Sequence, residues 1–448
     1  MTAAQTTLTQ AHPALGADLE PIREKVLAGR RLSFDDGLAL FRTRDIFTLG
    51  QLANHARERL HGRRAYYNVN RHINYTNYCV LRCKFCSFYR PYSKRRDEGT
   101  EGRRDGGTEG RRDEGTQARG DAGTLDRGDA YELTVEQVVA LAEQARDSGA
   151  TEAHIVGGLH PRLPFSYYTD MCRAIKQRCP ELHIKAFTAI EIIHFTRISR
   201  PRRTVQEVLC ELRDAGLGSL PGGGAEIFDD RVHDEAYKAK VGEKHWFDVH
   251  RAAHDLGIPS NCTMLYGHLE GHAERVRHLI KLREHQDQSL ARVQNAECRM
   301  QNAEGERTGP ARSGKRASSS FCIRPSAFQC CIPLSFIPEG SELAHLPGPT
   351  GLDDLRTLAV ARLMLDNIPH IKAFWPMQSA KLAQVALNWG VDDFDGTVVW
   401  YDITKREGRG TNNQRLTVEQ IRRLIREAGC EPVERDTLYR PAPAARRA

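Results

Sequence analysis

Short runs of β-branched and aromatic residues alternate along the chain with longer amphipathic segments. Each short run has Gly, Pro, Asn or Thr at or near its end, which is typical of a buried strand followed by a turn. The runs predict eight strands, at 72–77, 152–158, 183–189, 218–224, 260–267, 331–338, 370–376 and 393–399. The segments between them have apolar residues at helical spacing, and one begins with a capping box formed by Thr134 and Gln137. Strands that alternate with helices indicate parallel βαβ units.

Eight βα units predict an α/β protein with a (β/α)8 barrel of the TIM type. We expect an N-terminal helical segment over 1–70, the barrel over 71–400, and a C-terminal helix and tail over 401–448. Active sites of such barrels lie at the carboxyl ends of the strands. Residues that directly follow the predicted strands are therefore the candidates for chemistry.

Two polar stretches interrupt the alternation. The first, at about 93–128, repeats an eight-residue unit in which Asp recurs with Gly-Thr, and the second, at about 289–326, repeats the motif "QNAE". Apolar residues are scarce in both, so neither stretch can offset the entropy cost of becoming ordered. We predict two disordered inserts that loop out of the barrel.

The net charge of +7 is compatible with a nucleic-acid partner, but its position argues against one. Residues 289–326 carry seven Arg and Lys against three Glu, so more than half of the excess lies in the second insert. We therefore expect a solvated surface and no nucleic-acid partner. No run of about 18 apolar residues occurs and the N-terminus lacks signal-peptide features, so we expect a cytoplasmic protein without a membrane partner.

Three cysteines lie close together in "NYCVLRCKFCSFYR", at Cys79, Cys83 and Cys86, directly after the first predicted strand. Structural zinc usually takes four ligands, and no fourth cysteine or paired histidine follows nearby. A four-iron cluster also usually takes four thiolates, so three would leave one iron open to a substrate. The cationic neighbours Arg82 and Lys84 favour thiolates. A zinc site and three buried core cysteines are the alternatives.

The spacing CxxxCxxC, with the aromatic Phe85 before the last cysteine, resembles the signature of the radical S-adenosylmethionine superfamily. The resemblance implies a [4Fe-4S] cluster held by Cys79, Cys83 and Cys86. S-adenosylmethionine chelates the open iron in that superfamily, and its reductive cleavage yields methionine and a 5′-deoxyadenosyl radical. A structural metal-binding module is the non-enzyme alternative.

Longer motifs narrow the resemblance. "VGGLHP" together with "LPGGGAEIF" resembles the aminofutalosine synthase family of the futalosine route to menaquinone. Dehypoxanthine futalosine cyclases and deazaflavin-forming synthases share much of the pattern and remain alternatives. One departure is "WYDITKREG" after "DGTVV", where the family often continues with acidic residues, and this departure puts any substrate role at that strand end in doubt.

The resemblance implies a cofactor-binding role for four residues at strand ends, namely Phe85, Gly157, Gly158 and Glu191. The two glycines follow the second strand, where a side chain would prevent the backbone from approaching the methionine amino group. Glu191 follows the third strand, where related enzymes often bind the ribose. An ordinary strand-end turn for the glycines and a solvated helix start for Glu191 are the alternatives.

Three further residues at strand ends are candidates for catalysis. Glu226, in "GGGAEIF", is expected to face the pocket, with a plain helix-start glutamate as the alternative. His160 and His268 are candidates to bind a substrate carboxylate or to move a proton, although a lone histidine is more often structural.

The family reaction that the resemblance implies consumes S-adenosylmethionine as a substrate. The 5′-deoxyadenosyl radical adds to the vinyl carbon of 3-[(1-carboxyvinyl)oxy]benzoate, and the products are 6-amino-6-deoxyfutalosine, methionine and bicarbonate. The reductant implied is a flavodoxin- or ferredoxin-type protein. Such a reaction needs the vinyl carbon close to C5′ and the exclusion of water.

Overall fold

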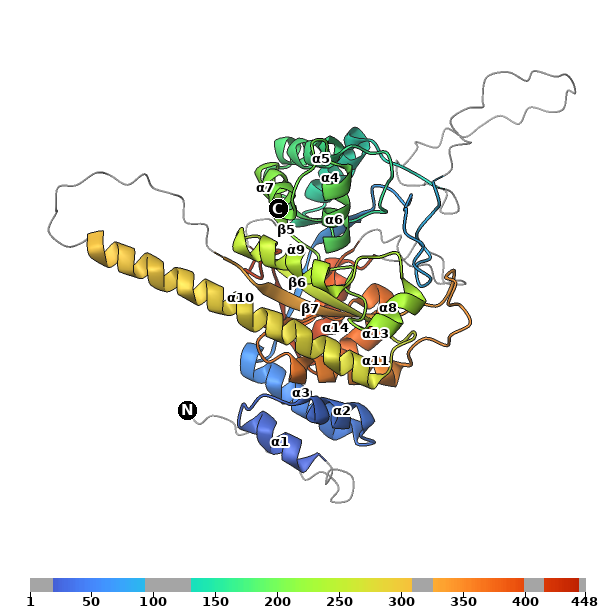
Figure 1. Ribbon diagram of the computed structural model, residues 1–448. Helices are drawn as coiled ribbons and strands as arrows, with labels where there is room; N and C mark the ends of the chain where they lie inside the picture. Colours follow the sequence, from blue (N-terminus) through green and yellow to red (C-terminus); the bar gives the residue numbers. More distant parts are fainter. Residues whose placement is uncertain (1–18, 93–129, 308–324, 399–414, 443–448) are drawn as a thin grey trace, which may run out of the picture.

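The computed structural model describes residues 19–92, 130–307, 325–398 and 415–442 (Figure 1). The strands are β1 Arg64–Asn68, β2 Asn70–Ile73, β3 Glu152–Ile155, β4 His183–Ala186, β5 Leu217–Ser219, β6 Ser260–Tyr266, β7 Phe328–Ser335, β8 His370–Ile371, β9 Asp393–Gly396 and β10 Glu431–Glu434. The helices are α1 Glu20–Leu27, α2 Phe34–Arg42, α3 Ile46–His61, α4 Val135–Asp147, α5 Phe165–Arg178, α6 Ala189–Ile198, α7 Val205–Asp214, α8 Asp230–Ala236, α9 Glu243–Asp255, α10 His272–Arg307, α11 Gly351–Met364, α12 Trp375–Gln378, α13 Ala380–Ala386 and α14 Val418–Glu427. Among these residues, no helix is both long and apolar enough to cross a membrane.

The parallel strands β2 to β9 form a barrel in chain order. Strands β2-β3-β4-β5 form one continuous ladder and β6-β7-β8 another. A bridge between Leu220 and Ser260 joins β5 to β6, and a bridge between Lys372 and Asp393 joins β8 to β9. The backbone N–H of His72 donates to the carbonyl of Val398 at 3.1 Å and brings the last strand back to the first. The predicted eight-stranded barrel is thus confirmed.

Two strands were not expected from the sequence. The segment 1–70 contains the predicted helices α1–α3 but ends in β1, which pairs with β9. The segment after 400 contains the expected helix α14, followed by β10, which pairs in parallel with the outer edge of β1. The described segments before and after the barrel therefore each add a strand to the sheet structure. Figure 1 shows α1–α3 against one side of the barrel, where α3 packs on α11.

Helix α10 corrects the predicted start of the second insert. The helix runs to Arg307, so the prediction of disorder from residue 289 is wrong for 289–307. Ser289 is fully buried, with its hydroxyl 3.0 Å from Nδ1 of His254, which fixes the helix to α9. Beyond it, Gln, Ala, Glu, Arg and Met are good helix formers despite their polarity. Residues 308–324 of this insert, the first insert and the "WYDITKREG" segment lie outside the described residues.

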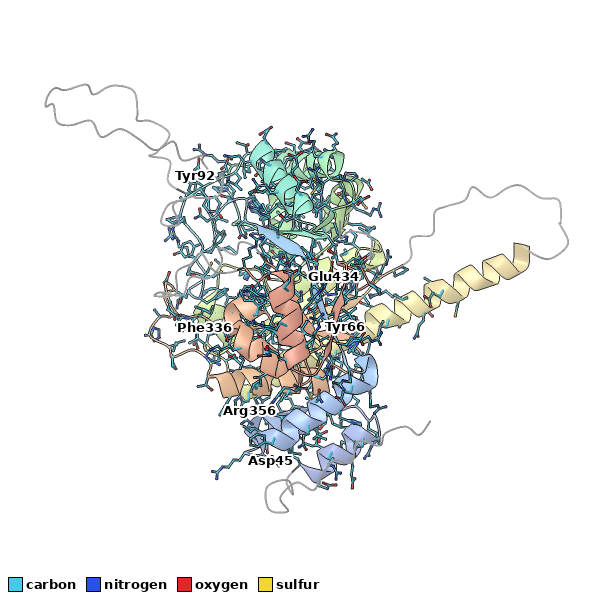
Figure 2. The ribbon with its side chains drawn as sticks, turned by 180° about the vertical axis from the view of Figure 1, so that it is seen from behind. Asp45, Tyr66, Tyr92, Phe336, Arg356 and Glu434 are labelled. Carbon is cyan, nitrogen blue, oxygen red and sulfur yellow. The ribbon has the colours of Figure 1, made fainter. Side chains whose placement is uncertain are left out.

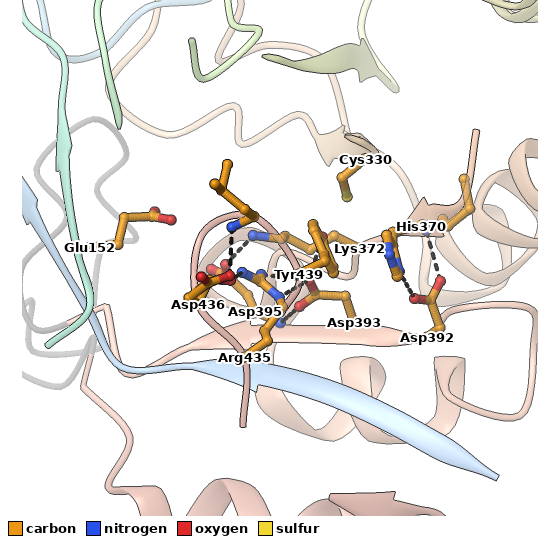
Figure 3. A network of polar contacts seen from close by, with 12 residues as sticks. Glu152, Cys330, His370, Lys372, Asp392, Asp393, Asp395, Arg435, Asp436 and Tyr439 are labelled. Carbon is orange, nitrogen blue, oxygen red and sulfur yellow. Dashed lines mark hydrogen bonds and ion pairs between the residues drawn. The ribbon is translucent and has the colours of Figure 1, made fainter. Parts of the chain in front are cut away.

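A buried charge network fixes the C-terminal segment to the barrel (Figure 3). Arg435 donates two hydrogen bonds to Asp393, at 2.9 and 2.5 Å, and the hydroxyl of Tyr439 donates to the same carboxylate oxygen at 2.6 Å. Lys372 donates to Asp395 at 2.7 Å. Arg435 and Asp393 are fully buried, so each charge depends on the other for compensation.

Replacing Arg435 with Met is expected to lower the free energy of unfolding by about 3–5 kcal/mol, because Asp393 would keep a buried charge without its main partner. Arg440→Met is the matched control, since Arg440 is exposed, and a change within about 0.5 kcal/mol is expected there. Urea unfolding of the two variants measures the difference. Equal stability of the two would show that the network does not hold the C-terminal segment.

Candidate active site

The loop that carries the three cysteines crosses the carboxyl ends of the barrel strands. It begins after β2, and its backbone is bound on three sides. The N–H groups of Cys79, Val80 and Lys84 donate to the carbonyls of Arg90, Leu159 and Ala236, at 3.0, 3.0 and 2.9 Å. The loop is therefore tied to the turn after β3 and to the end of α8, which places its thiols at the mouth of the barrel.

A cavity of about 250 Å³ lies beneath this loop. All three cysteines line it, together with most of the strand ends, and its walls are largely apolar. Phe336 belongs to this wall, and Figure 2 shows it on the same flank of the molecule as Tyr92. The remaining lining residues are Leu81, Phe85, Phe88, Tyr89, Val156, Gly157, Gly158, Leu159, Thr188, Ile190, Glu191, Gly223, Gly224, Glu226, Lys240, Leu265, Leu334, Ile337 and Met377.

The three thiols have environments suited to metal thiolates. Burial raises the pKa of each thiol, that of Cys83 to about 12. Local groups oppose this effect: the N–H of Leu81 donates to Sγ of Cys79 at 3.4 Å, and backbone N–H groups of the next turn lower the pKa of Cys86. A bound metal would remove the thiol protons outright, and N–H groups directed at the sulfurs favour the resulting thiolates.

The spacing of the thiols argues against a single metal ion. Among the described residues, only His61, His370 and Asp392 bring three candidate ligand atoms within 4.8 Å of one another. The carboxylate of Asp392 in that group already accepts hydrogen bonds from Arg362 and from the N–H of Ile371, so its role is structural. The three cysteine sulfurs do not form such a group, as the ligands of one tetrahedral zinc ion would, whereas a multi-iron cluster has its ligands on different metal atoms.

Gly157 and Gly158 form the floor of the cavity beside the cysteine loop. A Cβ atom on Gly158 would lie 2.2 Å from the carbonyl oxygen of Tyr78, the residue before Cys79. A Cβ atom on Gly157 would lie 2.6 Å from the ring of Tyr75. The glycines are therefore required by close packing of this turn against the start of the cysteine loop, and they also leave the turn open toward the cavity.

Glu191 lines the cavity, but all four of its hydrogen bonds come from the protein. Tyr75 and the N–H of Gly157 donate to one carboxyl oxygen, at 2.7 and 3.1 Å. The N–H and hydroxyl of Thr188 donate to the other, at 2.7 and 2.8 Å, as a capping box of α6. Glu191 thus fixes the Gly157 turn, while its proposed contact with the ribose stays a prediction.

Glu191 also predicts a pH dependence for the binding of S-adenosylmethionine. Burial raises its pKa to about 7, against the hydrogen bonds from Thr188, Tyr75 and Gly157, which lower it. As pH falls through 7, the carboxyl group of Glu191 takes up a proton, and the new O–H points at one of the groups that already donate to it. That hydrogen bond is lost, so the Gly157 turn loosens. The Kd for S-adenosylmethionine is therefore expected to rise. Calorimetry between pH 6 and 8.5 should show this rise in the wild type and a flatter profile in Glu191→Gln. Parallel profiles would contradict it.

Lys240 and Glu226 form an ion pair in the cavity wall. Lys240, in the loop between α8 and α9, was not identified from the sequence, because "YKAKVG" contains no recognisable motif. Its ammonium donates to Oε1 of Glu226, and their side chains are only 7% and 9% exposed. Although burial opposes its charge, Glu226 and the thiols of Cys83 and Cys86 keep the pKa of Lys240 above its ordinary value. Glu226 lines the cavity, while a catalytic role for it stays an untested prediction.

The two candidate histidines do not line the cavity. Nδ1 of His160 accepts hydrogen bonds from the N–H groups of Arg162 and Leu163, at 3.1 and 3.0 Å, so its proton is on Nε2, 2.8 Å from Glu132. Burial lowers the pKa of His160 to about 4, so the ring is neutral and braces the turn after β3.

His268 lies behind Phe85, with the two ring centroids 6.5 Å apart. Its Nε2 donates to the carbonyl of Leu265 at 3.1 Å. Neither His268 nor His160 is placed to reach a ligand in the cavity, and a catalytic role for either stays an untested prediction.

Three closely placed thiols and a glycine turn at the mouth of a closed barrel define the site of a radical S-adenosylmethionine enzyme, and residues 73–282 match the family described as "Radical SAM superfamily". Residues 326–447 match the "CofH/MqnC C-terminal region". The chain is 42% identical to an aminodeoxyfutalosine synthase of Thermus thermophilus, over 94% of this chain and 95% of the relative. It is 37% identical to the synthase of Streptomyces coelicolor, over 93% and 92%. The chain belongs to the aminodeoxyfutalosine synthase family.

Other relatives are less similar to this chain. A cyclic dehypoxanthine futalosine synthase of Halalkalibacterium halodurans is 28% identical over 94% of both chains. Methylornithine synthase, a solved structure, matches the fold with a TM-score of 0.59 at 15% identity, over 92% of this chain and 97% of the other. The chain is therefore an enzyme of the futalosine pathway of menaquinone biosynthesis, with a [4Fe-4S] cluster and S-adenosylmethionine as its cofactors.

Proposed function

We propose that the enzyme joins the adenosyl group of S-adenosylmethionine to 3-[(1-carboxyvinyl)oxy]benzoate with consumption of one water, giving 6-amino-6-deoxyfutalosine, methionine and bicarbonate. The observation that carries this proposal is the convergence of the three cysteines and the Gly157–Gly158 turn on one largely apolar cavity. The greater identity to aminodeoxyfutalosine synthases than to the cyclic dehypoxanthine futalosine synthases also supports it.

Cys79, Cys83 and Cys86 are the cluster ligands in this proposal. Their geometry fits a cluster because the thiols share one cavity and each is close enough to another to influence its pKa. When bound, the cluster and S-adenosylmethionine supply a 5′-deoxyadenosyl radical. The ligand set leaves no fourth protein thiol, because no other cysteine among the described residues lines the cavity.

The cavity wall determines what such a radical meets. Phe85, Leu334 and Phe336 are among the apolar side chains around the cysteine loop, so water and mobile hydrogen donors are largely excluded. Gly157 and Gly158 are proposed to let the backbone approach the methionine end, with Glu191 holding the turn in position. The small volume favours a close approach of the vinyl carbon to C5′.

A flavodoxin- or ferredoxin-type protein is the proposed electron donor. A second, open hollow of about 320 Å³ lies on the outer side of Cys86, between the cysteine loop and residues 340–342. Arg82 and Lys84 are exposed on the same loop, which favours an acidic protein partner near the cluster.

The direct test is anaerobic turnover with dithionite, S-adenosylmethionine and the enolpyruvyl benzoate carrying ¹³C in its enolpyruvyl carboxylate. The proposal expects the label to leave as bicarbonate and the product to have the mass of aminodeoxyfutalosine. Retention of the label in the product would exclude the proposed decarboxylation.

A further inference from the structure

Lys240 is the cation of the cavity wall. Among the described residues that line this cavity, it is the only Lys or Arg, and it lies in the loop after α8. Its Nζ atom is 5.5 Å from the ring centroid of Phe85 and 5.7 Å from that of Tyr237. The two aromatic faces confine the ammonium beside the cysteine loop.

The loop that carries Lys240 is rigidly held. Its backbone N–H donates to the carbonyl of Tyr237 at 2.8 Å, and its own carbonyl accepts from Nε2 of His233 at 2.9 Å. The hydroxyl of Tyr237 in turn donates to the carbonyl of Ile227 at 2.7 Å. The position of the ammonium is thus set by the fold before any ligand binds.

The hydrogen-bond capacity of this ammonium is not exhausted. A lysine ammonium has three donors, and within the described part of the chain only Oε1 of Glu226 accepts one of them. The side chain is 7% exposed, so water replaces few of the missing partners. A buried ammonium with unused donors at a cavity wall is costly unless an acceptor enters the cavity.

Glu226 is suited to hold the ammonium rather than to compete for the ligand. Its backbone has a φ of +48°, which is unusual for a residue with a side chain. Its carbonyl accepts from the N–H of Leu265 at 3.0 Å, which fixes this conformation against β6. A strained conformation maintained beside a cavity is typical of a functional position.

We propose that Lys240 binds a carboxylate of a ligand in this cavity, while Glu226 holds the ammonium in place. Two ligands are the candidate sources: the methionine carboxylate of S-adenosylmethionine, or the enolpyruvyl carboxylate of the substrate, whose assignment rests on the proposed function. A charged hydrogen bond in a water-poor wall gives both affinity and orientation.

Binding of ligand pairs that differ only in this carboxylate tests the inference. The probes are S-adenosylmethionine against its decarboxylated form, and the enolpyruvyl benzoate against 3-(vinyloxy)benzoate, measured by calorimetry on the anaerobic, cluster-loaded enzyme. In Lys240→Gln, the Kd of one carboxylate-bearing ligand should rise about 10- to 100-fold, with little change for its decarboxylated partner. Lys240→Arg should retain most of the affinity.

Two further variants keep the result interpretable. Lys240→Gln combined with Glu226→Gln removes both charges, so it avoids an unpaired buried carboxylate if the single variant does not fold. Lys238→Gln is the matched control, because Lys238 is exposed in the same loop. Its Kd values should equal those of the wild type.

The outcomes test the role of Lys240 separately from the proposed substrate, on which the inference partly rests. A selective loss for S-adenosylmethionine or for the enolpyruvyl benzoate assigns the source of the carboxylate. Unchanged discrimination for both pairs in the single and double variants would overturn the role of Lys240. If the wild-type enzyme binds S-adenosylmethionine but not the enolpyruvyl benzoate, the proposed substrate is wrong, and the S-adenosylmethionine pair still decides the role of Lys240.

Discussion

Replacement of Cys83 with Ala is expected to leave the enzyme without a four-iron cluster and without cleavage of S-adenosylmethionine. Cys83 is buried in the wall of the cavity, whereas Cys79 and Cys86 are partly exposed residues. The proposed ligand set has three thiolates only, so a missing one would expose a second iron and the cluster would not be retained. Iron and sulfide analysis, the visible absorption spectrum and the yield of methionine under dithionite measure the loss.

Cys172→Ala is the control for this experiment. Cys172 is fully buried in α5 and does not line the cavity, so its replacement perturbs packing without touching the site. Its iron content and its cleavage of S-adenosylmethionine should match the wild type. A normal cluster in Cys83→Ala would refute the ligand assignment.

Replacement of Gly158 with Ala is expected to reduce kcat about 100-fold, because a displacement of roughly 1 Å at a reacting centre has an effect of this size. The new Cβ atom would lie 2.2 Å from the Tyr78 carbonyl and 2.7 Å from its carbon, so one of the two backbones must move. Tyr78 is followed directly by Cys79, so the movement reaches the cysteine loop. Single-turnover kinetics under dithionite measure the change, and the Kd of S-adenosylmethionine should rise as well.

Gly242→Ala is the matched substitution. A Cβ atom there would meet no heavy atom within 4 Å, and its φ is not positive. As Gly242 is the N-cap of α9 and Ala caps less well than Gly, we expect a loss of about 0.5–1 kcal/mol in stability and normal turnover. Equal kcat values in the two variants would show that the turn after β3 does not need to be this close to the cysteine loop.

Much of the barrel could be predicted because its strands are buried on both faces and end in turn residues. All eight predicted strands are present, since runs such as 260–267 combine apolar and aromatic residues with a terminal glycine. Strand β10, by contrast, is short and contains a proline, and its pairing with β1 is a contact across nearly the whole chain. Such pairing leaves no local signal in the sequence. Helix α10 was cut short in the prediction because polarity was given more weight than helix propensity.

The candidate site likewise contains residues that the sequence could locate and residues that only the fold reveals. Residues adjacent to one another in a motif, such as the cysteines and the Gly157–Gly158 pair, could be located because their motifs resemble those of a known superfamily. Lys240 could not, because only the fold brings its loop to Phe85. The position of His160 at a strand end was also not enough to show that its side chain faces the cavity. Its ring accepts a hydrogen bond from the N–H of Leu163 in its own turn. Sequence position indicates the end of the barrel, whereas the direction of a side chain depends on tertiary packing.

The fate of C5′ of S-adenosylmethionine tests the central claim most directly. The enzyme should be incubated anaerobically with S-adenosylmethionine labelled with ¹³C at C5′, dithionite and the enolpyruvyl benzoate, and its products resolved by mass spectrometry and NMR. We predict that the label appears in the large product, in a new carbon–carbon bond. Stoichiometric labelled 5′-deoxyadenosine with no labelled adduct would contradict the account, because the radical would then abstract hydrogen as expected for a cyclase.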